Sequence, residues 1–279
     1  MLRHFTRVLH RTVDDELSAV VPTVRVDPRR PDCDRGCDFV VGDRADAFVK
    51  FSKRPEFNLC LHVLIAETDY LFFDKIPRES LPENNTFVGY SYGYINPSWP
   101  DHVALAHRYY PSDLNLVPSS GPAPGLLTGR TFRKLAPMWA DIQNAMDADP
   151  DVVKTYGWVR DMYSFSFALA RRKIRAFIPS VPFNQLMVQI PADDQIGQAV
   201  CIHYSWGAVI SINETKVWSF DKRTYDAQTM QPIPLLPMWT HEMRLQAGEK
   251  VSLGVYRVIQ LFVAKFNEAL LALSESSHL

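Results

Sequence analysis

The sequence has few cysteines, no long apolar run and no excess of charge of one sign, and each shortage excludes a class of protein. The formal net charge of the 279 residues is −1, which argues against a broad nucleic-acid-binding surface, because such surfaces carry a basic face. No run reaches the roughly 18 apolar residues of a membrane-spanning helix. Residues 1–22 also lack the apolar segment of a signal peptide. We therefore expect neither a signal, an anchor nor a membrane span within this chain.

The four cysteines are too few for a disulfide-dense scaffold. Cys60 and Cys201 lie in apolar, strand-like runs, where small buried thiols are common. Only Cys33 and Cys37 are placed so that they could pair with each other. A zinc knuckle is not expected there, because no second pair of cysteine or histidine ligands lies nearby.

The composition and the order of elements indicate an α/β protein. With 47% hydrophobic residues, the chain can bury a full core in one large domain or two small ones, and we expect one domain over 1–279. The periodicity predicts strands at 5–9, 23–26, 86–90, 186–190 and 199–204, and helices at 14–20, 44–53, 131–147 (with Pro137 near its start), 156–172 and 251–273. The last helix is amphipathic and is expected to pack on a sheet. Residues 80–125 are rich in turn-forming residues and predict a long surface excursion that shapes a substrate site.

The run from Leu59 to Phe73, LCLHVLIAETDYLFF, reads as a buried strand that ends in the two carboxylates of Glu67 and Asp69. In α/β sheets, ligands collect outside the carboxyl ends of strands. A gap of one residue lets both acids reach one Mg²⁺ or Mn²⁺ ion, which would neutralise a departing diphosphate. The same pattern also occurs at solvated strand ends and at helix N-caps, so the spacing alone leaves these interpretations open.

Seven blocks carry a resemblance to a known family. In order along the chain they are HFTRVLH, VPTVRVDP, IAETDYLFF, KLAPMWADIQNAMDADP, YGWVRDMYSFSFAL, IHYSWG and WSFDKRTY. Together they resemble the plant and algal hydroxyproline O-arabinosyltransferases and the related peptidyl serine α-galactosyltransferases. The resemblance runs from about Phe5 to the final helix.

This resemblance implies a GT-A-like fold with a mixed central sheet. It also implies retaining transfer of L-arabinofuranose or galactose from a UDP-sugar donor to hydroxyproline or serine of a glycoprotein, in the Golgi or the endoplasmic reticulum lumen. The cofactor would be Mn²⁺ or Mg²⁺, and a histidine ligand favours Mn²⁺. Asp69 would be the direct ligand and Glu67 a ribose, water-mediated or second ligand. His203 would be the third. Where the family has acid-proline-acid, this chain has Thr68 between the acids, so the pair is less rigidly oriented.

Other candidate residues have both a functional and a structural interpretation. His203 ends an apolar strand, where a hydrogen-bonded structural histidine is the usual case. Asp161 could act in catalysis, by accepting a hydrogen bond from the acceptor hydroxyl or by stabilising positive charge on the sugar ring, or it could pair with Arg160 or Arg172. The family usually has glutamate at this position, and the shorter carboxylate could alter specificity or activity. Lys222 and Arg223 could bind the diphosphate or belong to a solvated loop. Arg7 is a weaker candidate for donor binding.

Family members place one further strand and helix ahead of the HFTRVLH block, whereas this chain begins three residues before it. We therefore expect a fold that lacks the first strand and helix. A truncated gene product, a rearranged sheet and a protein without catalysis are the three explanations. The alternatives to a glycosyltransferase are an inactive glycoprotein-binding homologue and a metallohydrolase that uses the same acids and histidine.

Overall fold

The computed structural model describes residues 5–226 and 229–276. The chain divides into two compact units, which are described separately. The first comprises Met1–Ala66 and Arg78–Pro179, and the second comprises Glu67–Pro77 and Ser180–Leu279. The short segment 67–77 therefore belongs to the second unit although both of its flanks belong to the first. The expectation that residues 1–279 form a single domain stays a prediction.

The first unit begins with two parallel strands, β1 (Arg7–His10) and β2 (Thr23–Val26), joined through the 3₁₀ helix η1 (Glu16–Ala19). Arg7 lies opposite Thr23, and His10 lies opposite Val26. The β-branched residues of β2 favour an extended backbone, and the following Asp27-Pro28 ends the strand. Both strands pack near helix α1 (Arg44–Ser52).

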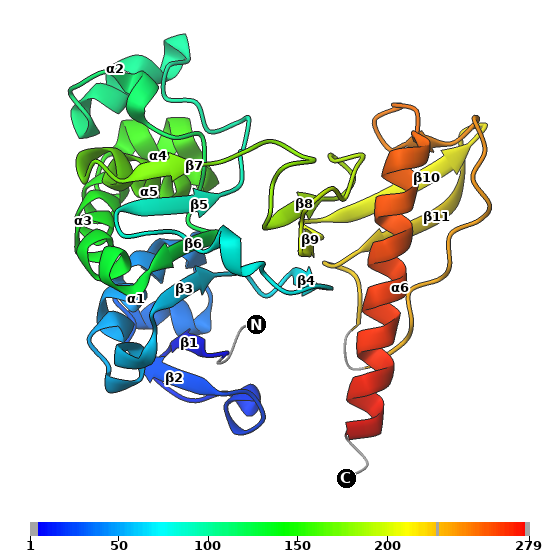
Figure 1. Ribbon diagram of the computed structural model, residues 1–279, viewed down its shortest axis with the longest axis horizontal. Helices are drawn as coiled ribbons and strands as arrows, with labels where there is room; N and C mark the ends of the chain where they lie inside the picture. The colour runs from blue at the N-terminus through cyan, green and yellow to red at the C-terminus, as the bar shows by residue number, and fades with distance from the viewer. Residues whose placement is uncertain (1–4, 227–228, 277–279) are drawn as a thin grey trace. The chain divides into compact units, whose positions relative to one another are not determined.

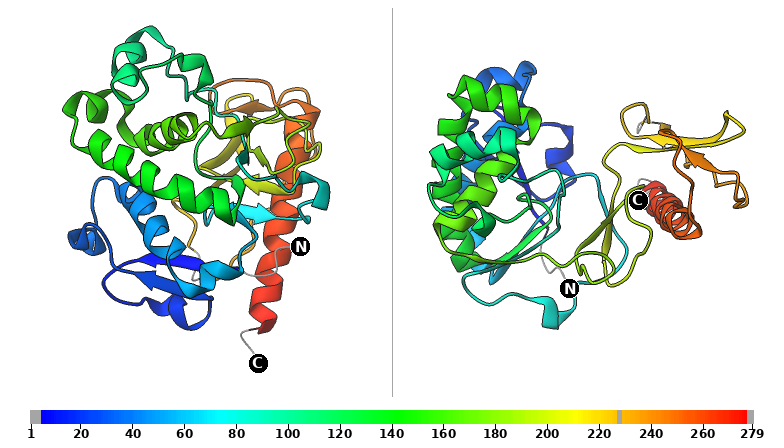
Figure 2. Two further views of the ribbon diagram at one scale, coloured as in Figure 1. Left: turned by 60° about the vertical axis from the view of Figure 1, so that its left-hand side comes forward. Right: turned by 90° about the horizontal axis from the view of Figure 1, so that it is seen from above.

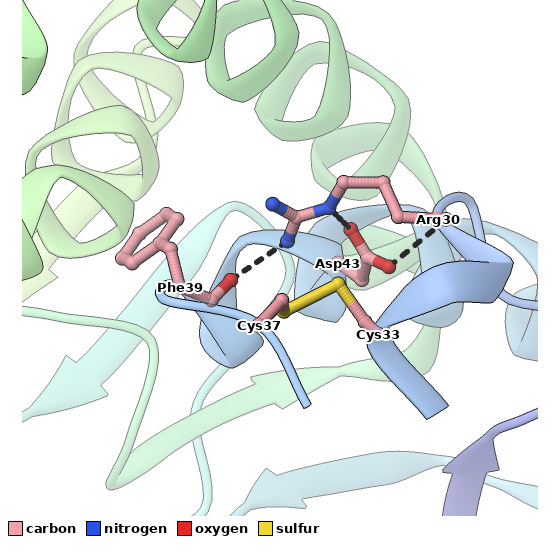
Figure 3. The surroundings of a disulfide bond; sticks show 5 residues. All are labelled: Arg30, Cys33, Cys37, Phe39 and Asp43. Atoms are coloured by element: carbon pink, nitrogen blue, oxygen red, sulfur yellow. Dashed lines mark hydrogen bonds and ion pairs between the residues drawn. A yellow bond between two sulfur atoms is a disulfide. The ribbon is translucent and has the colours of Figure 1, made fainter. Parts of the chain in front are cut away.

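A disulfide joins Cys33 and Cys37 in the segment after β2 (Figure 3). It links Cys33, inside the 3₁₀ helix η2 (Pro31–Arg35), to Cys37 in the connection that leads to the 3₁₀ helix η3 (Val40–Asp43). Beside it, Arg30 donates to the buried carboxylate of Asp43 at 2.6 Å and to the carbonyl oxygen of Phe39 at 2.7 Å. The prediction that only these two cysteines could pair is confirmed, since Cys60 and Cys201 are free thiols.

The larger sheet of the first unit is mixed. Its strands follow the order β3 (His62–Ile65), β6 (Gly125–Thr128), β5 (Thr86–Gly89) and β7 (Arg175–Phe177). β6 is antiparallel to both neighbours, whereas β5 and β7 are parallel. Helices α1, α3 (Gly129–Asp147) and α5 (Arg160–Arg171) gather beside this sheet (Figure 1). The predicted α/β class with a mixed sheet is confirmed.

The core of this unit lies between the sheet and helices α3 and α5. Thr128 caps α3 by accepting a hydrogen bond from the backbone N–H of Thr131 at 3.2 Å. Phe165 of α5 lies between Trp139 of α3 and Phe87 of β5, with ring centres 5.0 and 5.3 Å away. Its remaining elements are η4 (Pro55–Leu59), η5 (Arg78–Ser80), α2 (Pro100–Tyr109), η6 (Leu114–Leu116), α4 (Pro150–Tyr156) and η7 (Gly157–Val159).

Three helix and loop predictions need correction. The helix expected over 156–172 begins later, as α5 at Arg160, because Gly157 adopts a φ of +52° and ends α4, and the 3₁₀ helix η7 (Gly157–Val159) follows. Pro137 was expected near a helix start, yet it lies inside α3, where buried neighbours on both sides hold the helix across it. The surface excursion expected over 80–125 contains the expected strand at 86–90, observed as the buried β5, and also helix α2, which was not expected and opens with Pro100 at its first position.

The buried strand predicted to begin at Leu59 and to end at Glu67 and Asp69 is wrong at its start, because β3 begins at His62. Leu59 ends η4 and is 76% exposed, and the run then divides into β3 and β4 (Tyr70–Phe72), which belong to different sheets. Glu67 and Asp69 lie in the connection between the two strands. The acids thus follow the end of β3, as expected, but they also precede a second strand that the apolar pattern did not separate.

The second unit has two three-stranded sheets and a long helix. In one sheet, β9 (Cys201–His203) is antiparallel to β4 and parallel to β8 (Met187–Gln189). In the other, β10 (Gly207–Ile212) pairs with β11 (Thr215–Asp221) and β12 (Arg244–Leu245), all antiparallel. Asn213 and Glu214 form the turn between β10 and β11, with φ of +47° and +62°.

Helix α6 (Leu253–Ser276) lies along the β10–β11 hairpin (Figures 1 and 2). Its buried face includes Ile259 and Phe262, which join a core with Ile210, Trp218 and Phe220 of the hairpin. The prediction that this amphipathic helix packs on a sheet is confirmed. Within residues 5–226 and 229–276, no helix combines the length and the apolar composition that crossing a membrane requires.

Candidate functional site

The pairing of β4 with β9 brings Asp69 to His203. Tyr70 of β4 lies opposite His203, and the carbonyl oxygen of Asp69 accepts a hydrogen bond from the backbone N–H of Tyr204 at 3.2 Å. Two residues separated by 134 positions therefore sit side by side at the end of one short ladder. All of these contacts lie within the second unit.

The side chains of Glu67, Asp69 and His203 form a cluster of three ligand-type groups. One ligand atom of each lies within 4.8 Å of those of the other two. His203 Nε2 and Asp69 Oδ2 are 3.2 Å apart, and the ammonium of Lys222 bonds to the same Oδ2. His203 is 8% exposed, and its buried Nδ1 finds no hydrogen-bond partner among the described residues. We call these four residues the Asp69 cluster.

The carboxyl group of Asp69 is strongly acidic in this setting. Burial alone would raise its pKa, but the hydrogen bonds and charges of His203 and Lys222 outweigh burial and hold the pKa at about 2. Asp69 therefore carries a full negative charge at neutral pH. A buried anion of this kind is suited to holding a cation.

The donor set fits a divalent metal ion. Two carboxylates and one imidazole are ligands that Mn²⁺ accepts readily, while Mg²⁺ prefers oxygen alone. With metal–ligand distances near 2.1 Å, ligand atoms of an octahedral ion lie about 3.0 to 4.2 Å apart. The separations of up to 4.8 Å in the cluster need only small side-chain movements to reach that range. The orphaned nitrogen of His203 adds a buried group whose hydrogen-bonding capacity is unused.

The two cations that follow β11 have different surroundings. The backbone N–H of Lys222 donates to the carbonyl oxygen of Trp206 at 2.9 Å, and its side chain reaches Asp69. Arg223 instead donates to Asp221 at 2.9 and 2.5 Å, and its guanidinium lies 4.5 Å from the ring centre of Trp206. Lys222 therefore belongs to the Asp69 cluster. Arg223 forms an ion pair with Asp221. Its role in donor binding stays a prediction.

Asp161 lies in the first unit, in the first turn of α5. It is 4% exposed, and its Oδ2 lies 3.2 Å from Nη1 of Arg44 in α1. Arg160, which with Arg172 was the structural alternative as a partner of Asp161, donates to Asp147 at 2.9 Å. A catalytic role for Asp161 stays a prediction. The ion pair with Arg44 was missed, since the sequence gives no signal that joins the starts of two helices so far apart.

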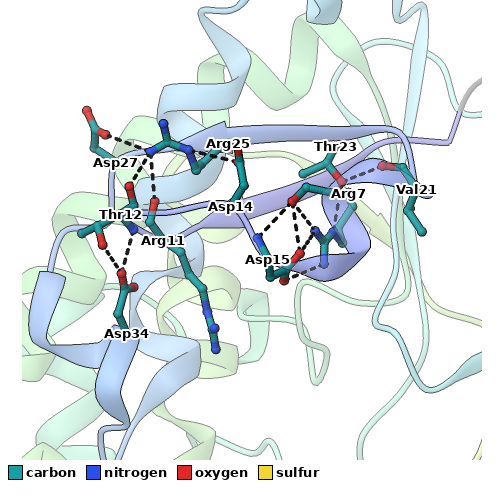
Figure 4. A network of polar contacts seen from close by, with 11 residues as sticks. Arg7, Arg11, Thr12, Asp14, Asp15, Val21, Thr23, Arg25, Asp27 and Asp34 are labelled. Atoms are coloured by element: carbon teal, nitrogen blue, oxygen red, sulfur yellow. Dashed lines mark hydrogen bonds and ion pairs between the residues drawn. The ribbon is translucent and has the colours of Figure 1, made fainter. Parts of the chain in front are cut away.

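Arg7 also lies in the first unit, within a network of polar contacts around β1 and β2 (Figure 4). Its guanidinium makes two bonds to Asp15, at 2.5 and 3.0 Å, and further bonds to Ser18 and Thr23. The bond from Arg7 is the main reason that the pKa of Asp15 falls to about 2. Donor binding by Arg7 stays a prediction, and this network gives the arginine a structural role as well.

Comparisons with known proteins identify the family. The model of the hydroxyproline O-arabinosyltransferase family N-terminal domain matches residues 1–178. The chain is 30% identical to hydroxyproline O-arabinosyltransferase NOD3 of Pisum sativum over 239 residues, which are 82% of this chain and 67% of the relative. It is also 30% identical to RDN1 of Medicago truncatula and to hydroxyproline O-arabinosyltransferase 3 of Arabidopsis thaliana, over 79% of this chain and 61% of each relative.

The similarity therefore extends beyond the first unit, because 79% of the chain is more than the 178 residues of the family match. The matched part of the chain spans 61% to 67% of the length of these relatives. No solved structure matches the chain. From the family match over more than half of its residues and from these relatives, the chain belongs to the hydroxyproline O-arabinosyltransferase family.

Proposed function

We propose that this protein is a metal-dependent, retaining glycosyltransferase that moves L-arabinofuranose or galactose from a UDP donor to hydroxyproline or serine of a glycoprotein. The observation that carries the proposal is the Asp69 cluster, which joins three ligand-type side chains and a lysine. Membership in a family whose curated members are named hydroxyproline O-arabinosyltransferases supports the acceptor and the choice of arabinose. Transfer with retention, galactose, serine and a GT-A-like fold rest on the resemblance of the sequence blocks.

In this proposal, each candidate residue has a distinct role. Asp69, His203 and Glu67 hold Mn²⁺ or Mg²⁺, which when bound neutralises charge on the diphosphate. Lys222 offsets the charge that develops on the leaving UDP. Arg223 and Arg7 contribute to donor binding, and Asp161 addresses the acceptor hydroxyl or the sugar.

We also place the protein in the lumen of the Golgi or the endoplasmic reticulum. The disulfide between Cys33 and Cys37 is compatible with this proposal, because structural disulfides persist in oxidising compartments.

Isothermal titration with UDP and Mn²⁺ tests the binding half of the proposal. The wild-type chain should bind UDP only when Mn²⁺ is present, and Asp69→Ala should lose at least about 90% of the affinity, since it removes a charged ligand. Glu268→Ala is the matched control, because this carboxylate is 68% exposed on α6 of the same unit. Absence of heat at millimolar UDP in the wild type would favour the alternative of an inactive glycoprotein-binding homologue.

Transfer is tested with UDP-arabinofuranose and UDP-galactose against two peptides that differ only in carrying hydroxyproline or proline at one position. The proposal requires a mass increase of one pentose or hexose on the hydroxyproline peptide alone. A serine peptide without hydroxyproline tests the second acceptor. Release of free sugar faster than transfer to any peptide would instead favour the metallohydrolase.

A further inference from the structure

Asp69 Oδ2 is shared by two groups. His203 Nε2 lies 3.2 Å from this oxygen, and the ammonium of Lys222 bonds to it directly. Asp69 is 15% exposed and Lys222 is 33% exposed, so their ion pair is only partly screened by water. The same oxygen belongs to the carboxylate that is the central member of the cluster of ligand-type groups.

Lys222 is held at this position by its backbone. Its N–H donates to the carbonyl oxygen of Trp206 at 2.9 Å, next to the paired residues Gly207 and Asp221 at the end of the β10–β11 ladder. The main chain at Lys222 is therefore fixed, while the four-carbon side chain remains able to swing. An ammonium on a flexible stem can leave one anion for another without any change in the fold.

A lysine ammonium and a divalent cation compete for the negative charge of one carboxylate oxygen. At about 4 Å, two positive charges in a partly buried site repel each other by an amount comparable to a strong hydrogen bond. A metal ion that binds Asp69 Oδ2 therefore weakens the ion pair with Lys222, and the repelled ammonium gains by moving to another anion.

We infer that Lys222 is an internal competitor of the metal ion. It neutralises Asp69 when no metal is bound, and it moves to the diphosphate of the donor when metal and nucleotide bind together. This inference rests on the proposed function and deepens it by assigning the order of events at the site. Metal alone has to break the pair between Lys222 and Asp69. Metal with a nucleoside diphosphate breaks that pair and forms a new one, so each ligand strengthens the binding of the other.

Mn²⁺ binding measured by electron paramagnetic resonance tests the inference without an activity assay. In the absence of nucleotide, Lys222→Met should bind Mn²⁺ about three- to tenfold more tightly than the wild type, because the competitor is gone. With saturating UDP the wild type should bind Mn²⁺ more tightly than Lys222→Met, because the variant lacks the cation that binds the diphosphate. UDP should therefore enhance Mn²⁺ affinity at least about tenfold less in Lys222→Met than in the wild type.

Two matched variants separate competition from a general change in charge. Lys216→Met removes an exposed positive charge from the same strand β11 and should leave both Mn²⁺ affinities unchanged. Lys222→Arg keeps a cation at the site. Without nucleotide, its affinity for Mn²⁺ should therefore be as weak as that of the wild type and weaker than that of Lys222→Met. Lys222→Arg also shows whether a change at 222 acts through loss of the fold.

The outcomes distinguish this inference from the proposed function. If the wild type and Lys222→Met bind Mn²⁺ equally, with affinity lost in Asp69→Ala, the metal site stands and the competition is overturned. If Lys216→Met tightens Mn²⁺ binding as much as Lys222→Met does, the effect is general electrostatics and the inference is again overturned. If no variant binds Mn²⁺ and the wild type does not either, the proposed metal site and the inference fail together.

Discussion

Asp161 and Arg44 form an almost fully buried ion pair, with side-chain exposures of 5% and 19%. A charge removed from water is costly unless its partner stays in place. We predict that Asp161→Asn lowers the free energy of unfolding by about 2 kcal/mol, because Arg44 loses its anionic partner. Urea denaturation measures the change.

Asp141→Asn provides the control for this substitution, because Asp141 is an exposed carboxylate on the neighbouring helix α3. Its unfolding midpoint should match that of the wild type. An unchanged midpoint in Asp161→Asn would show that the pair with Arg44 adds no stability. If this stable Asp161→Asn variant also transferred sugar more slowly than the wild type, the result would support a catalytic role for Asp161.

Single residues were predictable where chemistry and position coincided. Asp69 was identified from its place after an apolar run and His203 from the family resemblance, and the two side chains are in contact in the structure. Lys222 was expected as a diphosphate-binding cation from its place after a strand, and its bond to Asp69 was not predicted. The ion pair of Asp161 with Arg44 was not predicted. It depends on how the helices that carry the two residues pack in the folded unit, and no local sequence pattern indicates that packing.

At the scale of elements, helix α6 supports the β10–β11 hairpin that carries Lys222. Phe262 of α6 is fully buried, and its ring centre lies 5.2 Å from those of both Tyr204 and Phe220. We predict that Phe262→Ala destabilises the protein by about 3 to 5 kcal/mol, through lost burial and the cavity that remains. Differential scanning calorimetry should show a correspondingly lower melting temperature.

Leu271→Ala removes a side chain of similar character from the same helix, but Leu271 is 66% exposed. Its expected cost is below about 1 kcal/mol, since little apolar surface returns to water. Equal destabilisation by the two variants would contradict the packing of α6 described above.

Elements were predictable in proportion to their length. Helix α6 and helix α3 show apolar periodicity over several turns, and both were expected close to their observed bounds. Strand β4 has three residues, so that alternation cannot define it, whereas β9, also of three residues, lies inside the strand expected at 199–204. The break at Gly157 depends on a positive φ, which glycine permits but does not require.

At the scale of the whole molecule, the segment 67–77 is the least predictable feature. It lies between two parts of the first unit in sequence, yet its strand β4 completes a sheet of the second. Hydrophobic pattern reports burial and does not report the partner sheet. Glu67 and Asp69 therefore lie near His203 because β4 pairs with β9, and the sequence pattern does not indicate that pairing.

This pairing can be tested by a cross-link between β4 and β9. Phe72 lies opposite Cys201, and the neighbouring pair carries the hydrogen bond from Phe73 N–H to Val200 at 3.0 Å. Phe72 and Cys201 are therefore a non-hydrogen-bonded pair, whose Cα atoms are typically about 4.5 Å apart, within the range of a disulfide. We predict that Phe72→Cys forms a disulfide with Cys201 under oxidising conditions. Phe72 is 37% exposed, so its replacement removes little from the core.

Non-reducing peptide mapping by mass spectrometry detects the linked peptides. Burial raises the pKa of the Cys201 thiol, so little of it is thiolate at neutral pH and oxidation should be faster at alkaline pH. Leu71→Cys is the control, because residue 71 lies opposite Ile202 and its side chain points to the other face of the sheet. A cross-link to Cys201 that forms equally from position 71, or from neither position, would mean that β4 does not pair with β9 in this register. The contact of Asp69 with His203 would then lose its structural basis, because that register is what brings the two residues together.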